Sequence, residues 1–399
     1  MSNENMLKQK VIRPVSTAEL ERRWKAVRNV MKEKQVDFLI FQSNNDYLGG
    51  LVKWFSDEPA MHCYPATVIF PAQDGMTTIW HGSSNPDQAS PPEWSLRGVK
   101  KRLSTPIMLS LNYTCTYDAE RVVEELKNHK NCRICMLNEA AMTSGFVTYV
   151  RQHLSSTTFV DITDEIDAIK ALKSPEEIER IKENALMHDT AMAACFDAIR
   201  PGVREYEVAA AGRYKCMMLG SEQQIIFVGS APPGLPIPFN LPHAMNRELK
   251  AGDQVGILIE VNDAAGYYTH LYRIACIGRI PGALEAQYEV ARQAQNLSLS
   301  LVKPGADPVE ILKANNAFMR ERGLPEETRI YAHGQGYDMV ERPSFQPGET
   351  MKIAAGMNIS VHPAAAGKDA FAMITDNYIV TETGVSECIH KTLKKIFTV

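Results

Sequence analysis

A helix-start signal near the middle of the chain divides the sequence into two halves with different patterns. The tetrapeptide Ser-Pro-Glu-Glu at 174–177 is typical of a capping box, in which Ser174 caps the helix and Glu177 reaches back to it. Apolar residues then recur at helical spacing up to the next Pro-Gly pair. Because 399 residues exceed one ordinary core, we expect two domains, residues 1–168 and 169–399.

The first half alternates short strands and helices. A helix is expected over 17–35, a strand over 37–43 and a hairpin with its turn at 73–75. A second helix over 117–130 precedes a strand over 133–139. Such alternation favours one sheet covered by helices, and therefore an α/β domain.

The second half predicts helices packed on an antiparallel sheet, which is an α+β domain. Its helical runs repeat apolar residues every three or four positions, whereas its strand-like runs are apolar or alternating. Beyond the helix that starts at Ser174, the expected helices cover 204–219, 282–302 and 307–322, and the expected strands cover 223–229, 253–261, 266–278, 357–362 and 371–381.

Composition argues against several classes of protein. Lys and Arg number 43 against 47 Asp and Glu, so no basic surface for nucleic acid is expected. Apolar runs are too short to span a membrane, and the polar N-terminus lacks a signal-peptide core. The eight scattered cysteines favour free thiols in a cytoplasmic protein. Cys132 and Cys135 form an isolated CxxC in a strand-like run, which favours a buried strand over a zinc or redox motif.

The distinctive polar residues of the second half lie in or beside its expected strands. Glu260 directly follows an apolar run, where a carboxylate must be paired or ligated. His270 and Tyr272 are two positions apart, so on a strand they face the same side. Taken singly, each histidine also fits a hydrogen-bonded structural role. The histidines concerned are His243, His270, His333 and His362.

Eight segments, in order between residues 173 and 384, resemble the creatinase and aminopeptidase P superfamily, which has the pita-bread fold, and the resemblance as a whole covers nearly the whole chain. The strongest is KSPEEIERIKENA at 173–185, and others are LPHAMNRELKAGD at 241–253 and YAHGQGYDMVERP at 331–343. The resemblance implies a creatinase-like α/β domain followed by a pita-bread catalytic domain. It also implies a homodimer, in which the partner's first domain helps to close an active site near the subunit interface.

The resemblance further implies where the metal ligands of the family's peptidases would fall. Those enzymes hold two ions with two Asp, one His and two Glu, a hard ligand set that suits a metal pair. Here the first Asp position is Glu260 or Asn262, the second is His270, the His is His333, the first Glu is His362 and the second Glu is Thr375. A bridging carboxylate is therefore lost, and a dinuclear peptidase site is not expected.

In the family, the positions occupied here by His270, His333 and His362 all contact the same one of the two metals. Three neutral imidazoles form a common site for one Zn, Fe or Mn ion. We therefore predict a mononuclear three-histidine metal site and no organic cofactor. The alternative, similar to the metal-free creatinase-type members, is a polar pocket in which these histidines bind an anionic substrate.

The resemblance assigns roles to other residues. His243 matches the histidine that creatinase uses as its general acid or base, and Glu260 is a fourth ligand or a base. Tyr272 is a candidate base if the ion and Arg273 lower its pKa. In the first domain, residues 45–47 and 53–56 resemble the family's loop that reaches toward the active site, and His62 is a further candidate there. The candidate substrate-binding residues are Arg273, Glu341, Trp54 and Phe55.

Three functions follow from these assignments. The leading hypothesis is a creatinase-like hydrolase that cleaves a C–N bond of a small amide, cyclic amide or amidine. The second is a metal-assisted lyase acting on a small carboxylate, similar to the family's dimethylsulfoniopropionate-cleaving enzyme. The third is a pita-bread binding module without catalytic activity. Polar residues at nearly every site position favour an enzyme over the binding module.

Overall fold

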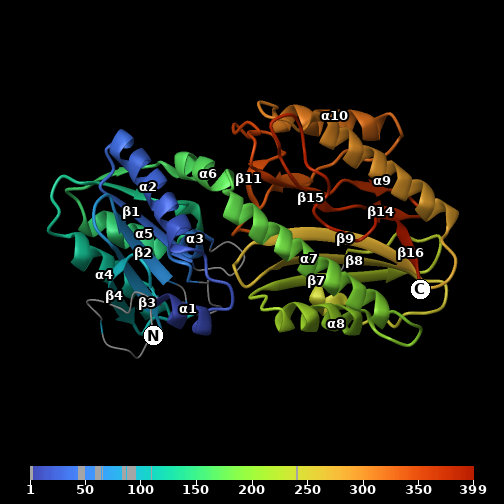
Figure 1. The fold of residues 1–399 in the computed structure, drawn as a ribbon, viewed down its shortest axis with the longest axis horizontal. Helices are drawn as coiled ribbons and strands as arrows, with labels where there is room; N and C mark the ends of the chain where they lie inside the picture. The colour runs from blue at the N-terminus through green and yellow to red at the C-terminus, as the bar shows by residue number, and fades with distance from the viewer. Residues whose placement is uncertain are drawn as a thin grey trace. The chain divides into compact units, whose positions relative to one another are not determined.

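The computed structural model describes residues 3–43, 50–58, 64, 66–82, 87, 96–108, 110–239 and 241–399. The candidate loop at 45–47 and His62 lie outside these ranges. The chain divides into two compact units, Met1–Lys170 and Ala171–Val399 (Figure 1). Across the described ranges, no helix combines the length and the apolar character needed to cross a membrane.

The first unit contains a six-stranded mixed sheet in the order β4-β3-β2-β1-β5-β6. The neighbours β1–β2 and β2–β3 are antiparallel, and the other neighbours run parallel. Its described helices are α1 (Asn3–Lys10), α2 (Thr17–Lys34), α3 (Gly50–Ser56), α4 (Tyr117–Leu126), α5 (Ser144–His153) and α6 (Thr163–Ala171), with the 3-10 turns η1 (Asn112–Thr114) and η2 (Glu139–Ala141). Its strands are β1 (Phe38–Ser43), β2 (Ala66–Pro71), β3 (Met76–His81), β4 (Val99–Thr105), β5 (Arg133–Met136) and β6 (Thr158–Val160).

The α/β prediction for the first domain is confirmed, including the hairpin of β2 and β3. Sequence patterns missed β4 and β6. The run of β4, VKKRLST, carries three consecutive basic residues and lies at the edge of the sheet. Charged edge strands limit unwanted pairing with other chains, but they hide the apolar alternation by which a strand is recognised.

The second unit contains two four-stranded sheets, β16-β9-β8-β7 and β11-β10-β12-β15, and the pair β13-β14. Its described helices are α7 (Pro175–Ala198), α8 (Glu205–Met218), α9 (Gly282–Leu301) and α10 (Pro308–Arg320), with the 3-10 turn η3 (Pro242–Ala244). Its strands are β7 (Gln224–Ala231), β8 (Gln254–Asn262), β9 (Tyr268–Cys276), β10 (Ala332–Gly334), β11 (Glu341–Ser344), β12 (Asn358–Val361), β13 (Ala364–Ala366), β14 (Phe371–Met373), β15 (Asp376–Ile379) and β16 (Ile396–Thr398).

The predicted helices of this unit are confirmed, and α7 begins with the predicted capping box of Ser174 and Glu177. The predicted strand 371–381 is instead two short strands, β14 and β15. Strands β10, β11, β13 and β16 were not predicted, because runs of three or four residues are too short to show a period.

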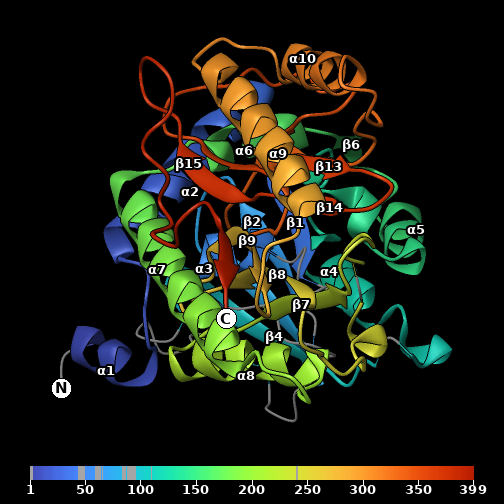
Figure 2. The same cartoon turned by 90° about the vertical axis from the view of Figure 1, so that its right-hand side faces the viewer.

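Helices cover both faces of the sheet that contains β7, β8 and β9. On one face, α7 and α8 pack against apolar side chains such as Ile257 and Leu271. On the other face, α9 contributes Leu284 and Tyr288 to a second cluster with Tyr272. Figure 2 shows α8 below and α9 above the strands. This layering buries both faces of β8 and β9, so polar side chains on these strands lie in the interior.

His188 on α7 joins the helix to this sheet with both ring nitrogens. Nδ1 lies 3.0 Å from the carbonyl oxygen of Asn184, and Nε2 accepts a hydrogen bond from the N–H of Val261 at 3.3 Å. The ring must therefore be neutral, with its proton on Nδ1. Burial lowers the pKa of His188 from 6.5 to about 4.

We predict that His188 makes the protein less stable in acid. The unfolded chain binds a proton at this residue near pH 6.5 and the folded chain only near pH 4, so the free energy of unfolding falls as the pH drops between these values. The shift corresponds to roughly 3 kcal/mol. Urea unfolding measures this effect. The free energy of unfolding of His188→Gln should fall less steeply with decreasing pH than that of the wild type over this range. The exposed His153→Gln serves as control, and equal slopes in both variants would contradict the prediction.

Candidate metal centre

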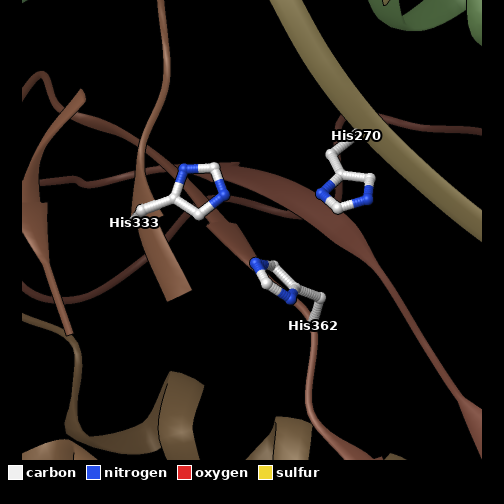
Figure 3. Close-up of side chains that lie close together, drawn as sticks. All are labelled: His270, His333 and His362. Atoms are coloured by element: carbon white, nitrogen blue, oxygen red, sulfur yellow. The ribbon is translucent and has the colours of Figure 1, made fainter. Parts of the chain in front are cut away.

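Three histidines from three strand segments converge in the second unit. His270 lies in β9, His333 in β10, and His362 directly after β12. One ligand nitrogen from each lies within 4.8 Å of the other two, and all three side chains are buried. Figure 3 shows the three rings gathered around one space. The structure therefore places in one cluster the residues that the family resemblance selected.

The spacing of the rings fits one shared ion. Imidazoles bound to a tetrahedral ion through bonds of about 2.0–2.1 Å have ring centroids about 5 Å apart. The centroids of His270 and His362 are 5.0 Å apart and those of His333 and His362 are 5.2 Å apart. His270 and His333 are 6.5 Å apart, so these two rings would have to approach each other to share an ion.

The hydrogen bonds leave ring nitrogens available as ligands. His333 Nδ1 lies 2.8 Å from the carbonyl oxygen of Gly334, which can only accept, so Nδ1 carries the proton and the lone pair of Nε2 is free. Nε2 of His362 is also buried without a hydrogen-bond partner and faces the other rings, whereas in His270 the nitrogen that faces them is Nδ1 (Figure 3). A partner on the non-ligating nitrogen is typical of metal-bound histidine.

The three rings are held neutral, as metal ligands must be. Burial lowers the pKa of His333 to about 4 and the pKa values of His270 and His362 well below 6.5. The mutual proximity of the rings and the positive charge of Arg329 lower the pKa values of His270 and His362 further. Each histidine therefore offers an unprotonated nitrogen at neutral pH.

Glu260 lies beside this cluster because of the strand register. It pairs with His270 across β8 and β9, and its Oε1 is 3.5 Å from His270 Nδ1. The same oxygen accepts a hydrogen bond from Gln335 Nε2 at 2.8 Å. Burial raises the pKa of Glu260 to about 8. Asn262, the other candidate for this position, instead accepts hydrogen bonds from the backbone N–H groups of residues 222 and 223, so Glu260 is the residue at the cluster.

Tyr272 shares the site face of β9 with His270, but its surroundings oppose a role as base. Its hydroxyl packs over Gly256, where a Cβ atom would come within 2.0 Å of the oxygen, and Ile237 lies beside it. Burial raises the pKa of Tyr272. The expected lowering by Arg273 does not occur, because Arg273 alternates to the other face of the strand.

Arg273 is engaged by the protein itself rather than available to a substrate. Its guanidinium donates to Asp376 Oδ1 at 2.6 Å and to the backbone carbonyls of Tyr272, Thr375, Thr392 and Leu393. The side chain has no exposed surface. We therefore correct its predicted role: Arg273 joins β9 to β15 and the C-terminal segment.

Glu341, predicted to bind substrate, is also committed to internal contacts. Its Oε2 accepts from Lys173 Nζ at 2.6 Å and its Oε1 from the N–H of Asp338 at 3.2 Å. Glu341 nevertheless lies near enough to His333 to raise the pKa of that ring slightly against the effect of burial. The ion pair attaches the start of α7 to β11 at the edge of the site.

Trp54 and Phe55 lie in the core of the first unit. Phe55 packs between Phe41 and Phe70, with ring centroids 4.3 and 5.0 Å away. Arg23 donates to the carbonyl oxygen of Trp54 at 2.9 Å. Both aromatic side chains are almost fully buried, at 1% and 0% exposure, so within this unit they stabilise the fold and present no surface to a ligand.

His243 lies on the turn η3 and is exposed. Within the described part of the chain, no hydrogen bond or ion pair joins it to the three histidines. Its predicted role as general acid or base stays a prediction.

Sequence reasoning missed several residues that surround the cluster. Ser360 and Asn377 are polar residues within strands, whereas Gln335 and Arg329 lie outside them. Gln335 contacts Glu260, Ser360 Oγ lies 3.4 Å from His270 Nδ1, and Asn377 Oδ1 accepts from the backbone N–H of His270 at 2.7 Å. Arg329 adds a positive charge near the rings. For Ser360 and Asn377 the only available signal was an uncharged polar residue inside an apolar strand, and Gln335 and Arg329 carried no such signal.

A second group of ligand-type side chains, Asp376, Cys388 and His390, does not offer a comparable site. Asp376 is already bound by Arg273, and Lys394 Nζ lies 3.6 Å from its other oxygen. Two cations beside one carboxylate oppose the binding of a third. This group is part of the structural contacts behind β9.

Comparison with known proteins gives consistent matches. A sequence profile of metallopeptidase family M24 matches residues 179–382. Xaa-Pro dipeptidase from Pyrococcus furiosus is 26% identical over 305 residues, which covers 73% of this chain and 81% of that protein. Creatinase from a Bacillus species is 26% identical over 348 residues, which covers 83% and 78%.

Solved structures show the same fold. Dipeptidase PepE from Mycobacterium ulcerans superposes with a TM-score of 0.76 at 20% identity, over 97% of this chain and all of that one. Prolidase from Pyrococcus horikoshii superposes with a TM-score of 0.72 at 19% identity, over 93% of this chain and 99% of the other. The predicted fold is confirmed: an α/β domain is followed along the chain by a pita-bread domain.

We predict that removing the guanidinium of Arg273 destabilises the fold. Arg273→Met would leave Asp376 buried with its main partner lost, which costs about 3–5 kcal/mol. Guanidinium chloride unfolding would measure this loss. Arg279→Met, an exposed arginine just beyond the same strand, should change the free energy of unfolding little. An Arg273→Met protein as stable as this control would contradict the structural role.

We also predict that the purified protein holds about one divalent ion per chain. Plasma mass spectrometry should find this ion in the wild type and in His243→Ala, and should find it lost in His270→Ala and His362→Ala. The wild type should be purified without chelator and then incubated with Zn²⁺, Fe²⁺ or Mn²⁺. If it contains no metal when purified and takes up none of these ions, the result would favour the metal-free pocket.

Proposed function

The chain belongs to metallopeptidase family M24, and on that premise we propose that it is a hydrolase that cleaves a C–N bond in a small molecule with one divalent ion on His270, His333 and His362. The observation that carries the proposal is the cluster of three buried neutral imidazoles with Glu260 in contact with one of them. The named relatives, Xaa-Pro dipeptidases and creatinase, support hydrolysis as the class of reaction.

The donor set supports one ion rather than two. A pair of ions needs bridging carboxylates. Among the residues that the structure describes, Glu260 is the one carboxylate in contact with a histidine of the cluster. The second-Glu position is Thr375, whose hydroxyl is buried without a partner, and the neighbouring Asp376 is bound to Arg273. Three imidazoles, with one carboxylate beside them as a base, fit a single Zn, Fe or Mn ion.

The chemistry follows from this arrangement. A divalent ion bound there would polarise the scissile carbonyl or amidine carbon and lower the pKa of the attacking water. Glu260 is placed to take the proton from that water and to return it to the leaving nitrogen, because its carboxylate lies 3.5 Å from His270 at the cluster. His270, His333 and His362 remain neutral throughout and keep the geometry fixed.

The burial of the site favours a small substrate. His270, His333 and His362 are exposed by 5%, 2% and 6%, so the reacting group must enter the interior of the second unit. Tyr272 and Ile237 pack over Gly256 on the same face of β8 as Glu260. An amide, cyclic amide or amidine of few atoms fits these surroundings better than an extended peptide. The raised pKa of Tyr272 gives no support to a lyase that uses this tyrosine as base.

A matched pair of variants tests the proposal. Glu260→Gln should keep the bound ion but lose about 10²–10⁴-fold in turnover, because the amide cannot shuttle a proton. The exposed Glu285→Gln should retain activity. The assay is a screen of small amides, cyclic amides, amidines and Xaa-Pro dipeptides with metal-loaded protein. Full activity after chelation of the ion, or in Glu260→Gln, would contradict the proposed function.

A homodimer with the active site near the subunit interface also stays a prediction. Light scattering of the purified protein would give the mass of the assembly.

A further inference from the structure

Three amide side chains meet beside Glu260 and His270. Gln335 follows β10, Asn358 begins β12 and Asn377 lies in β15, and each is 1% exposed or less. We call Gln335, Asn358 and Asn377 the amide network. Buried amides are costly unless every donor and acceptor has a partner, so their hydrogen bonds identify what the network does.

The orientation of each amide in the network can be assigned by starting from a backbone N–H group. The N–H of His270 can only donate, so the oxygen at 2.7 Å must be Oδ1 of Asn377. The amide nitrogen Nδ2 of Asn377 therefore faces the other way. It donates to Oε1 of Gln335 at 2.9 Å and to Oδ1 of Asn358 at 3.2 Å.

Asn358 is oriented by the same logic. Because its Oδ1 accepts from Asn377, its Nδ2 is free to donate, and it does so to the carbonyl oxygen of Gln335 at 3.0 Å. The N–H of Gln335 returns a hydrogen bond to the carbonyl oxygen of Asn358 at 3.0 Å. These two bonds hold the backbone of Gln335 against β12.

The orientation of the Gln335 side chain follows. Its Oε1 is occupied as an acceptor, so its Nε2 points to the opposite side, where it donates to Glu260 Oε1 at 2.8 Å and to the carbonyl oxygen of Met339 at 3.0 Å. Both N–H groups are used. A flipped amide would set donor against donor at Asn377 and oxygen against oxygen at Met339, so the network permits one orientation only.

We infer that Gln335 is a positioning residue that fixes which oxygen of Glu260 does the proton transfer. Oε1 is held by the hydrogen bond from Gln335 Nε2, which orients the carboxylate and leaves Oε2 as the oxygen without this contact. The inference rests on the proposed function, in which Glu260 transfers protons. The network also joins Glu260 on β8 to the backbone of His270 on β9 through the second sheet.

The chain offers a matched control for the test. Gln295 is another fully buried glutamine of the second unit, and its Nε2 donates to the carbonyl oxygen of Val361 and to Asp376 rather than to Glu260. Gln335→Met and Gln295→Met each remove one buried amide and keep the length of the side chain. A purely structural role for Gln335 would make the two variants behave alike.

The first readout is a crystal structure of each variant without metal. In Gln335→Met, the carboxylate of Glu260 should leave its position beside His270, whereas in Gln295→Met it should stay. An unmoved Glu260 in Gln335→Met would overturn the inference. If Gln335→Met fails to fold, Gln335→Glu replaces the donor by an acceptor of the same shape, and Glu260 should then turn away or share a proton.

The second readout is the visible absorption spectrum of each variant loaded with Co²⁺. Gln335→Met should alter the ligand-field bands relative to wild type, and Gln295→Met should not, because only the first changes the surroundings of His270 and Glu260. Identical spectra in Gln335→Met and wild type would overturn the inference. Failure of the wild type to bind Co²⁺ would overturn the proposed metal site instead, and the crystal comparison would still decide the role of Gln335.

Discussion

The candidate site depends on the contact between β9 and β15. The two four-stranded sheets of the second unit supply different histidines: His270 comes from one, and His333 and His362 come from the strands of the other. The buried ion pair of Arg273 and Asp376 joins these sheets on the far side of β9 from His270. A buried ion pair is stable only when the remaining hydrogen-bonding groups of both partners are satisfied. The guanidinium of Arg273 meets this condition by donating to backbone carbonyls as well, and these bonds fix the junction between the two sheets. The three imidazoles keep their spacing as long as this junction holds.

Burial alone does not distinguish the candidate ligands from structural histidines. Burial lowers the pKa of His188 and His390 as it does for the cluster. His188 uses both ring nitrogens in hydrogen bonds to the protein, and so does His390, with contacts of 3.4 Å to the N–H of Asn377 and the hydroxyl of Thr269. His270 and His362 each keep a buried nitrogen without a partner. Since an unpaired buried polar atom costs free energy, Nε2 of His362, which faces the other two rings, indicates a ligand that the protein itself does not supply, whereas Nε2 of His270 faces away from them (Figure 3).

The sequence predicted the fold more completely than the site. Long periodic segments such as α7 and the paired runs of β8 and β9 carry their own signals, whereas the three residues of β10 do not, although His333 lies there. The resemblance to a family selected His270, His333 and His362 without showing that they meet. Arg273 was misassigned although strand alternation already places it opposite Tyr272. The amide network was not foreseen, because no local pattern shows that Gln335, Asn358 and Asn377 lie together.

The central claim is that a family built around carboxylate ligands is represented here by a site with three imidazoles for one ion. X-ray absorption at the zinc edge, on protein loaded with one equivalent of Zn²⁺, tests it most directly. We predict a first shell that contains about three imidazole nitrogens at about 2.0–2.1 Å, with no second metal at about 3.5–4 Å. A metal–metal distance in that range, or a shell of carboxylate oxygens without imidazole, would contradict the account.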